Sequence, residues 1–551
     1  MDAAVDWSGE QTGGGVAADG VWAAAAAGGC PQCRSFKVKA DLAYGQARYW
    51  HAQHARAVER EAALTARIEE LQAQLHQSER RLFGEKSERS KSKVAGKGRQ
   101  QGTRPRGQQR GAAGHGRRRR GEQRPAVEEL WDLDEPQRRC ARCQRPYERL
   151  DHTEDREILE VEVRAHRRVI RRQRYRPTCQ CPAPPGIVTA PGPAKLLAKG
   201  SLGISVWVAV LIDKYLFQRP TYRWLADLRL TQGVAIAQGT LTDGLQRLVP
   251  LFAPVREALV KKSLQAQHWH ADETGWPVYV KREGKAGHHW QLWVFQSRDA
   301  VVFQLEPTRA GKVPQAYFGE PARGILSVDR CSAYKGLRKS GRIVLAYCWA
   351  HVLRDFVRIA RDWGAQRQHW AEGWVECIGE LYRLNRQRLR VRGDAPAFAV
   401  ADAELRGAVE RMAVWREAEL ANAEVGGIAR KTLKSMATHW TGLVVFLDHP
   451  DVPMDNNTAE RTQRTPVVGR KNYYGSGAEW SGKLAATMFS LFQTLLLWKL
   501  HPRLWLHAYL DACAHNGGRP PTDLSAFLPW EMSAPRLQQM SARIATHPDS
   551  S

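Results

Sequence analysis

The sequence lacks a long apolar segment and contains few cysteines. Its most apolar stretch, residues 202–217, is interrupted by Asp213 and Lys214 and falls short of the roughly 18 residues that a membrane span needs. Ten cysteines among 551 residues are too few for a disulfide scaffold, and six of them form close pairs, which is typical of metal binding in a reducing compartment. We therefore expect a soluble cytoplasmic protein with no membrane partner.

Acidic residues are also scarce beside the basic ones. The chain has 83 Lys and Arg against 57 Asp and Glu, a formal net charge of +26. Residues 91–120 hold eleven Lys or Arg, seven Gly and no Asp or Glu, including the run Arg117, Arg118, Arg119 and Arg120. Because such a segment cannot bury a core, we predict that residues 91–127 form a flexible arm that contacts DNA phosphates, with a solvated linker as the alternative.

The first 90 residues divide into two segments of different composition. Residues 1–50 are rich in Gly and Ala and show no clear apolar period, so we expect disorder or weak helix there. In residues 51–90, apolar side chains recur at spacings of four, three, four and seven, at Leu64, Ile68, Leu71, Leu75 and Leu82. This pattern predicts a coiled coil that joins copies of the chain into a homo-oligomer, although an amphipathic helix docked on its own chain also fits.

Four cysteines in residues 128–195 form two close pairs. They are Cys140, Cys143, Cys179 and Cys181. Four thiolates can complete a tetrahedral Zn²⁺ site, and the β-branched residues in the intervening 158–175 are typical of a hairpin. We predict a small zinc-ribbon-like module with structural zinc, with free structural cysteines as the alternative because the second pair is spaced C-x-C.

Residues 196–262 have the apolar spacing of helices. Tyr222, Leu225 and Leu228 share one helical face, Gly233 should end that helix, and Thr240 should open another. Two helices joined by a glycine-containing turn are compatible with a DNA-binding helix-turn-helix. An ordinary helical hairpin is compatible as well, because the turn is longer than usual.

From residue 263 to 360 the pattern changes to strands. The expected order is three strands, a helix and a fourth strand, over residues 266–272, 289–295, 301–305, 312–318 and 325–329. That order is the core of the ribonuclease H fold, in which the first and fourth strands lie side by side. Asp272 should end the first strand and Asp329 the fourth, so both carboxylates should meet at one edge of the sheet.

Two carboxylates held close together repel one another unless a cation lies between them. Their hard oxygen ligands select Mg²⁺ or Mn²⁺, and a pair of such ions is suited to phosphodiester chemistry. Strand alternation from Trp269 places Asp272 and His270 on one face and Glu273 on the other, which favours Asp272 over Glu273 without eliminating it.

A third carboxylate is expected from a helix. Glu460 lies in a segment that Asp455 or Asn456 can cap and that Pro466 should end, although Asp455 is itself a competing candidate for the third acid. The flanking Arg461 and Arg464 suit a surface that faces phosphates.

Four segments, HADETGWPV, SVDRCSAYKGL, YCWAHVLRDF and MDNNTAERTQRTPVVGRKNYYGSG, resemble the transposases of the insertion-sequence 66 family. The resemblance runs from about residue 64 to 514. It implies a bacterial, nucleoid-associated DDE transposase in which Asp272, Asp329 and Glu460 bind the metals. It also implies a mostly helical insertion over residues 361–450, a core helix with a C-terminal helix over 451–515, a tail over 516–551, and accessory proteins encoded alongside.

Further residues in these segments suggest supporting roles. His351 of the Cys348-x-x-His351 motif is expected to support the site, while Arg470 and Lys471, next to aromatic residues, are expected to bind DNA. Taken together, the sequence predicts an α+β multidomain enzyme that cleaves the ends of a mobile element and joins them to double-stranded target DNA. A zinc-containing DNA-binding regulator without catalysis and a nuclease on the same fold are the alternatives.

Overall fold

The computed structural model describes 31–83, 130, 132–149, 163–176, 178, 186–198, 200–280, 288–320, 322–363 and 365–541. The predicted basic arm, with Arg117 to Arg120, and the second cysteine pair, Cys179 and Cys181, lie outside these residues. The chain divides into two compact units, one formed by residues 1–86, 259–276 and 289–464, and the other by residues 87–258, 277–288 and 465–551. Within the described residues, no helix has the length and apolar character that a bilayer crossing requires.

The first unit is built on a five-stranded mixed sheet. Its strands stand in the order β5-β4-β3-β6-β7 and are, in chain order, β3 His268–Pro277, β4 His289–Gln296, β5 Val301–Glu306, β6 Gly324–Val328 and β7 Ile343–Tyr347. β4 and β5 are antiparallel, whereas β6 runs parallel to both β3 and β7. The predicted adjacency of the first and fourth strands of this sheet is therefore present.

Most of the sheet is buried because its strands are rich in apolar residues, although β3 also carries the polar His270, Asp272 and Glu273. Trp269, Trp293 and Val328 are fully buried, as expected of strands covered on both faces. Helix α7, Lys312–Phe318, packs on the sheet, where the ring of Tyr317 stacks on Phe295 with centroids 3.9 Å apart.

One expectation about β3 is wrong. The strand continues past Asp272 to Pro277, while its pairing with β6 stops at His270, opposite Ser327. Asp272 is therefore inside a strand, just beyond the end of β6, because β4 continues as the neighbour of β3 after β6 has ended.

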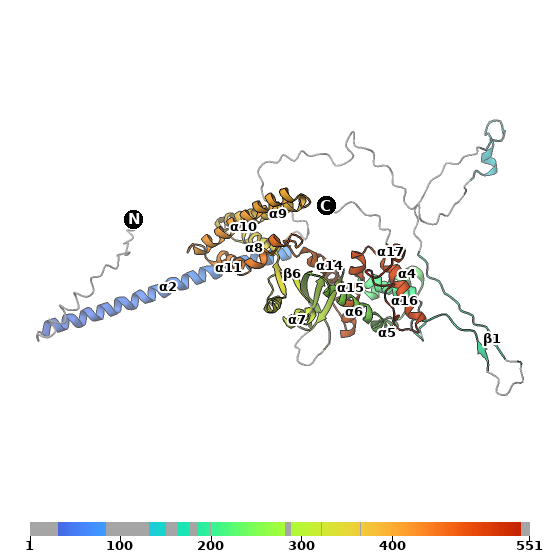
Figure 1. Cartoon of the computed structure of the whole chain (residues 1–551), viewed down its shortest axis with the longest axis horizontal. Helices are drawn as coiled ribbons and strands as arrows, with labels where there is room; N and C mark the ends of the chain where they lie inside the picture. Colours follow the sequence, from blue (N-terminus) through green and yellow to red (C-terminus); the bar gives the residue numbers. More distant parts are fainter. Residues whose placement is uncertain are drawn as a thin grey trace. The chain divides into compact units, whose positions relative to one another are not determined.

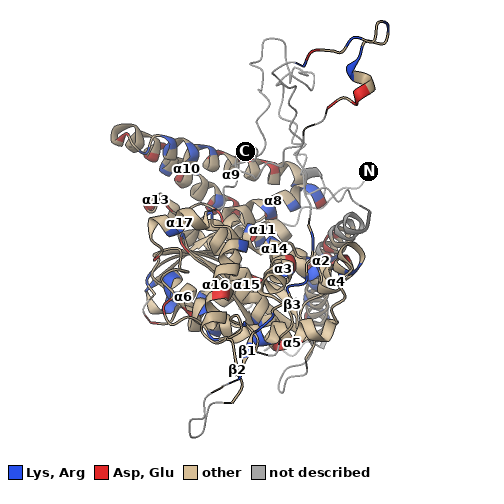
Figure 2. Cartoon of the chain, turned by 90° about the vertical axis from the view of Figure 1, so that its right-hand side faces the viewer, with Lys and Arg blue, Asp and Glu red and all other residues tan. Residues whose placement is uncertain are grey.

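A block of helices follows the sheet, as the resemblance implied. It comprises α8 Trp349–Asp362, α9 Ala365–Arg390, α10 Ala395–Ala421, α11 Gly427–Thr438, α12 Trp440–Leu443 and α13 Val445–Asp448. Trp374 of α9 stacks on Trp415 of α10 at 4.0 Å, and the fully buried Arg388 donates to Asp402 and to the carbonyl oxygens of Phe446 and Leu447. Figure 2 shows basic and acidic residues interspersed along α9 and α10.

Helix α14, Asn457–Tyr473, carries Glu460 and corrects another expectation. Pro466 lies inside this helix and does not end it. A proline removes one helical hydrogen bond, and neighbouring side chains hold the helix against that loss. Thr462 Oγ1 donates to Gln296 Oε1 at 2.6 Å, and Gln463 Nε2 donates to the Leu292 carbonyl at 3.2 Å.

The long helix α2, Pro31–Phe83, begins well before residue 51, so residues 31–50 are helical, which is the second of the two alternatives expected there. The apolar side chains of the predicted coiled coil that can be described are exposed, namely Leu64, Ile68, Leu71 and Leu75. Glu69, on the same helix, forms an ion pair with Arg367 of α9. The described part of the chain therefore leaves this apolar stripe uncovered, and the coiled coil stays a prediction.

The second unit is mainly helical (Figure 1). Its helices are α3 Ile204–Tyr215, α4 Thr221–Gln232, α5 Gln238–Leu248, η2 Val249–Phe252, α15 Glu479–Leu497, α16 Pro502–His515 and α17 Ala534–Met540, while α6 Ala253–Leu264 crosses between the units. Gly233 ends α4 with a left-handed φ of 64°, as predicted. Residues 516–541 are folded rather than a loose tail, because Trp505 Nε1 donates to the Phe527 carbonyl and Met540 is buried.

Candidate active site

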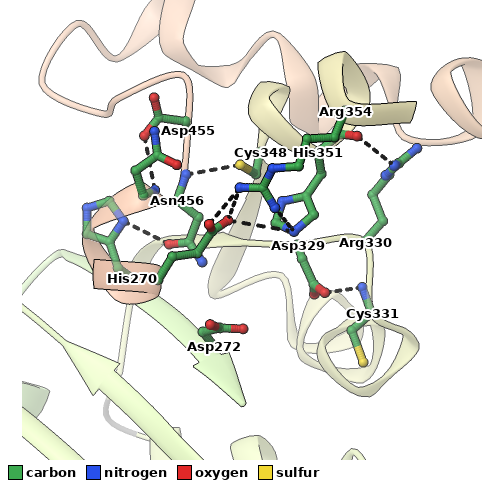
Figure 3. A network of polar contacts seen from close by, with 12 residues as sticks. His270, Asp272, Asp329, Arg330, Cys331, Cys348, His351, Arg354, Asp455 and Asn456 are labelled. Carbon is green, nitrogen blue, oxygen red and sulfur yellow. Dashed lines mark hydrogen bonds and ion pairs between the residues drawn. The ribbon is translucent and has the colours of Figure 1, made fainter. Parts of the chain in front are cut away.

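The register of the sheet brings the two predicted aspartates to one edge. Asp329 directly follows the last residue of β6, and Asp272 lies two residues beyond the end of the β3–β6 pairing. The Oδ1 atom of Asp329 accepts a hydrogen bond from the Cys331 backbone N–H at 2.9 Å. Figure 3 shows the Asp272 and Asp329 carboxylates in the same site.

The electrostatics of Asp272 are those of a carboxylate among other carboxylates. Burial raises the pKa of Asp272 to about 8, and the nearby charges of Glu273, Asp329 and Glu460 add to that rise. A backbone N–H from Glu273, 2.9 Å from Asp272 Oδ1, opposes it. All three predicted acids are therefore close enough to interact.

The competing carboxylate, Glu273, already has partners. Its side chain is only 1% exposed, and its Oε1 accepts from Arg309 Nε at 2.8 Å and Nη2 at 2.6 Å. The Tyr334 hydroxyl donates to Oε2 at 2.6 Å. Both oxygens of Glu273 are therefore hydrogen-bonded, whereas Asp272 forms no ion pair among the described residues.

Glu460 lies in the first turn of α14 and is held by a cation. Arg354 of α8 donates from Nη2 to both carboxylate oxygens, at 2.8 and 2.6 Å, and His351 Nε2 is 3.7 Å from Oε1. The Arg354 side chain is half exposed. The other candidate, Asp455, accepts from the Asn457 backbone N–H at 3.0 Å and so helps to begin the helix.

His351 lies beside Glu460, as its predicted supporting role requires. Its Nε2 is 3.4 Å from Arg354 Nη1 (Figure 3). Burial, together with the charge of Arg354, lowers the pKa of His351, whereas Glu460 raises it. A neutral imidazole is the form able to ligate a metal or accept a hydrogen bond.

Two groups of side chains among the described residues have donor atoms that all lie within 4.8 Å of one another. They are Cys348, His351 and Glu460, and Glu273, Asp329 and Cys331. The predicted triad of Asp272, Asp329 and Glu460 is not a third such group among the described residues.

The sequence analysis missed the role of Asn456, which it treated only as a possible helix cap. This side chain is 1% exposed. Its Oδ1 is 3.0 Å from His270 Nδ1, its Nδ2 donates to the Ala271 carbonyl at 2.7 Å, and its backbone N–H donates to Cys348 Sγ at 3.1 Å. Asn456 thus fixes the start of α14 against β3 next to Asp272 (Figure 3). The repeated Asn in MDNNTAE was the one available signal.

Comparison with known proteins gives the family. Residues 199–484, which are 286 of the 551, match the model of the Transposase IS66 family. The chain belongs to the IS66 family of transposases. This confirms the resemblance seen in the sequence, and the matched range contains all three predicted acids.

Relatives of this IS66-family protein include uncharacterized and named sequences. The uncharacterized protein y4jD of Sinorhizobium fredii is 26% identical over 423 residues, which cover 74% of this chain and 80% of the relative. A second protein of that organism, y4hP, is 26% identical over 68% of this chain and 70% of its own length. The transposase for insertion sequence-like element IS431mec of Staphylococcus aureus is 23% identical, over 35% of this chain and 92% of its own length.

Of the residues predicted to bind DNA, four lie along α14, namely Arg461, Arg464, Arg470 and Lys471. Arg461, Arg464 and Lys471 are exposed, and Arg470 is partly buried. Nothing in the described contacts ties these four to the three acids.

The first cysteine pair of the predicted zinc module forms a tight turn. The Cys140 backbone N–H donates to the Arg145 carbonyl at 2.8 Å, and Gln144 has a left-handed φ of 59°. Hydrogen bonds from the backbone N–H groups of Cys143 and Arg142 lower the pKa of the Cys140 thiol, which favours the thiolate that zinc requires. The expected hairpin over residues 158–175 is different in the structure, because β1, Arg174–Tyr175, pairs with β2, Val188–Thr189.

Proposed function

We propose that this IS66-family protein is a DDE transposase that cuts the ends of a mobile DNA element and joins them to target DNA. The observation that supports this most directly is the half-buried Asp272 carboxylate, whose neighbours include Asp329 and Glu460 and whose pKa is raised. A clustering of like charges is unfavourable in the free protein, and it is relieved when a divalent cation binds.

The donor set fits Mg²⁺ or Mn²⁺. All three side chains supply carboxylate oxygens, the ligands that these hard cations prefer. We propose that Asp272 and Asp329 hold the metal ions and that Glu460 completes the site, on a sheet whose strand order supports a ribonuclease H-like core. Two bound ions would supply Lewis-acid stabilisation of the attacking and leaving oxygens at a phosphodiester.

The chain's own residues provide positioning and charge. Asn456 holds the first turn of α14 against β3, which keeps Glu460 within reach of Asp272. Arg354 is half exposed, and its Nη2 donates to both carboxylate oxygens of Glu460; a guanidinium binds phosphate oxygens as well. We propose that a DNA phosphate takes over Arg354 and frees Glu460 for the metal. No serine, tyrosine or cysteine nucleophile is required.

The remaining parts of the proposal concern binding and assembly. A zinc ion held by Cys140, Cys143, Cys179 and Cys181 would order the small module. The exposed apolar stripe of α2 supports pairing with a second copy of the chain. The arm over residues 91–127 would contact phosphates, and accessory proteins encoded alongside would assist.

The decisive experiment incubates the purified protein with labelled element-end DNA and a target plasmid, in Mg²⁺, Mn²⁺ or EDTA. The variants are Asp272→Asn and Glu460→Gln, with Glu410→Gln on the exposed side of α10 as a matched control. We expect metal-dependent nicking and joined product with the wild type and the control, and neither product with the two site variants.

Each other outcome contradicts the proposal in a different way. Nicking without joining would indicate a nuclease. DNA binding without nicking, in the presence of both metals and the accessory proteins, would indicate a regulator. Full activity of Glu460→Gln would show that the third acid is misassigned.

A further inference from the structure

A short antiparallel ribbon in the second unit has no role in the catalytic proposal. Residues 163–176 contain β1, Arg174–Tyr175. β1 pairs with β2 in the register Arg174 opposite Thr189 and Tyr175 opposite Val188. The Ala190 backbone N–H donates to the Gln173 carbonyl at 2.9 Å, and Arg172 Nε donates to the Ala190 carbonyl at 2.6 Å. Every residue from 163 to 176 is exposed, and Figure 1 shows the two segments running side by side.

The charges on this segment are all of one sign and fall mainly on one face. Residues 163–176 contain seven arginines and no Asp or Glu. In an extended chain alternate residues point to the same side, so the even-numbered positions form one face. That face, called the arginine face below, carries Arg164, His166, Arg168, Arg172, Arg174 and Arg176. The opposite face carries two arginines, Arg167 and Arg171, between the apolar Val163, Val169 and Tyr175.

Arginines elsewhere in the described chain are commonly paired with carboxylates. Arg219 pairs with two aspartates and Arg392 with Asp451. By contrast, no ion pair to a described residue involves Arg168, Arg174 or Arg176 of the arginine face. No described carboxylate therefore neutralises these three side chains.

We propose that the arginine face binds the phosphates of one strand of duplex DNA. Alternate residues of an extended chain are ~6.6 Å apart, so the arginine face presents its cations at short, regular intervals, and the phosphates of one DNA strand are also regularly spaced. Successive arginines can therefore meet successive phosphate positions, and a guanidinium binds phosphate through paired hydrogen bonds. A second copy of the chain is a poor occupant, because two arginine faces would repel each other.

This inference rests on the proposed function, which requires that the protein binds DNA. It adds the identity of one surface that contacts the DNA. The contacts would be independent of base sequence, since phosphates carry no sequence information directly. They would position the second unit on the duplex, in addition to anything the arm contributes.

The test compares two double variants of the full chain that lose the same charge. Arg168→Ala with Arg174→Ala removes two groups from the arginine face, and Arg167→Ala with Arg171→Ala removes two from the opposite face. Fluorescence anisotropy with a labelled 30-base-pair duplex, from about 0.05 to 0.3 M salt, gives the slope of log K against log salt. Each lost phosphate contact should reduce the slope by ~0.9.

We expect the arginine-face variant to lower the slope by ~1.8 and to weaken binding on the order of 50-fold at 0.1 M salt. The opposite-face variant should lower the slope by less than half as much. Circular dichroism and melting temperature should match the wild type for both, since all four side chains are exposed.

Several results separate this inference from the proposed function. Equal slopes for the two variants, with a wild type that binds, would overturn the arginine face while leaving DNA binding intact. A difference seen only with single-stranded DNA of the same length would overturn the assignment to a duplex. Absence of salt-dependent DNA binding by the wild type would instead contradict the proposed function.

Discussion

Replacing Asp272 with asparagine should stabilise the metal-free protein while abolishing its response to Mg²⁺. In the wild type the folded state must hold an ionised carboxylate in a half-buried position beside Glu273, Asp329 and Glu460. Asparagine has nearly the same shape and no charge. The variant therefore removes the repulsion and leaves the packing of β3 unchanged.

The size of the effect follows from the pKa of Asp272, which rises from 3.8 to about 8 on folding. At ~1.4 kcal/mol per pKa unit, the cost of ionising this carboxyl in the folded state has an upper limit of roughly 6 kcal/mol. Water and side-chain movement in a half-buried site reduce that cost, so we expect a gain of ~2 kcal/mol at pH 8. The melting temperature of the first unit should rise by about 4–8 °C.

The pH dependence has a definite sign. Between about pH 4 and 8 the folded protein binds a proton at Asp272 that the unfolded chain has lost, so the wild type becomes less stable as the pH rises through this window. The variant lacks this contribution. The stability difference between the two proteins should therefore be near zero at pH 4 and largest at pH 8.

Thermal unfolding monitored by circular dichroism in EDTA and in Mg²⁺, at pH 5 and pH 8, tests the reasoning. Mg²⁺ should stabilise the wild type more at pH 8 than at pH 5 and should leave the variant almost unchanged. Glu410→Gln, which removes an exposed carboxyl from α10, serves as the control and should behave as the wild type. A variant no more stable than the wild type at pH 8 in EDTA would refute the repulsion on which the metal site is argued.

Three further predictions concern residues outside the acidic cluster. Gly244→Ala should destabilise the second unit by ~2–4 kcal/mol, because the new Cβ would lie 1.9 Å from the Trp207 ring. Gly239→Ala in the same helix is the control, since its new Cβ meets nothing within 4 Å and should cost no stability. The melting temperatures of the two variants test this difference. Asn456→Ala should cost ~3 kcal/mol in urea denaturation and should also slow DNA cleavage, since it removes two buried side-chain hydrogen bonds at the start of α14. Burial lowers the pKa of Lys214 to about 8, so between about pH 8 and 10.5 only the unfolded chain keeps the proton and the wild type becomes more stable as the pH rises. Lys214→Met should stabilise the protein near pH 7 and should remove that rise in stability. Denaturation at pH 7 and pH 10 measures both effects.

Much of the catalytic sheet could be predicted because its signals are local. β4, β5 and β6 are short, mainly apolar runs between turn residues, and the predicted ranges differ from these three strands by at most one residue at either end. Strand order alone then suggested that Asp272 and Asp329 would meet. Alternation favoured Asp272 over Glu273, and the structure gives a physical reason, since Arg309 and Tyr334 bind the Glu273 carboxylate.

The misses depend on partners distant in sequence. Pro466 was expected to end a helix on local grounds, but Thr462 is anchored to Gln296, 166 residues away. Asn456 acquires its role from His270 and Cys348, which are 186 and 108 residues away. No pattern within a window of ten or twenty residues contains such contacts.

The order of the site's elements along the chain also affects how the enzyme is made. β3 and β6 can pair early, because the helix and strands between them form a compact and local unit. Glu460 reaches them only after the helices between Trp349 and Asp448 have been synthesised and packed, and contacts across so many residues form late in folding. A chain that stops inside those helices has both aspartates in place but lacks the third acid. If the proposed function and the arginine face both hold, a shortened copy that keeps this face would occupy duplex DNA without cutting it and would compete with the intact chain for DNA.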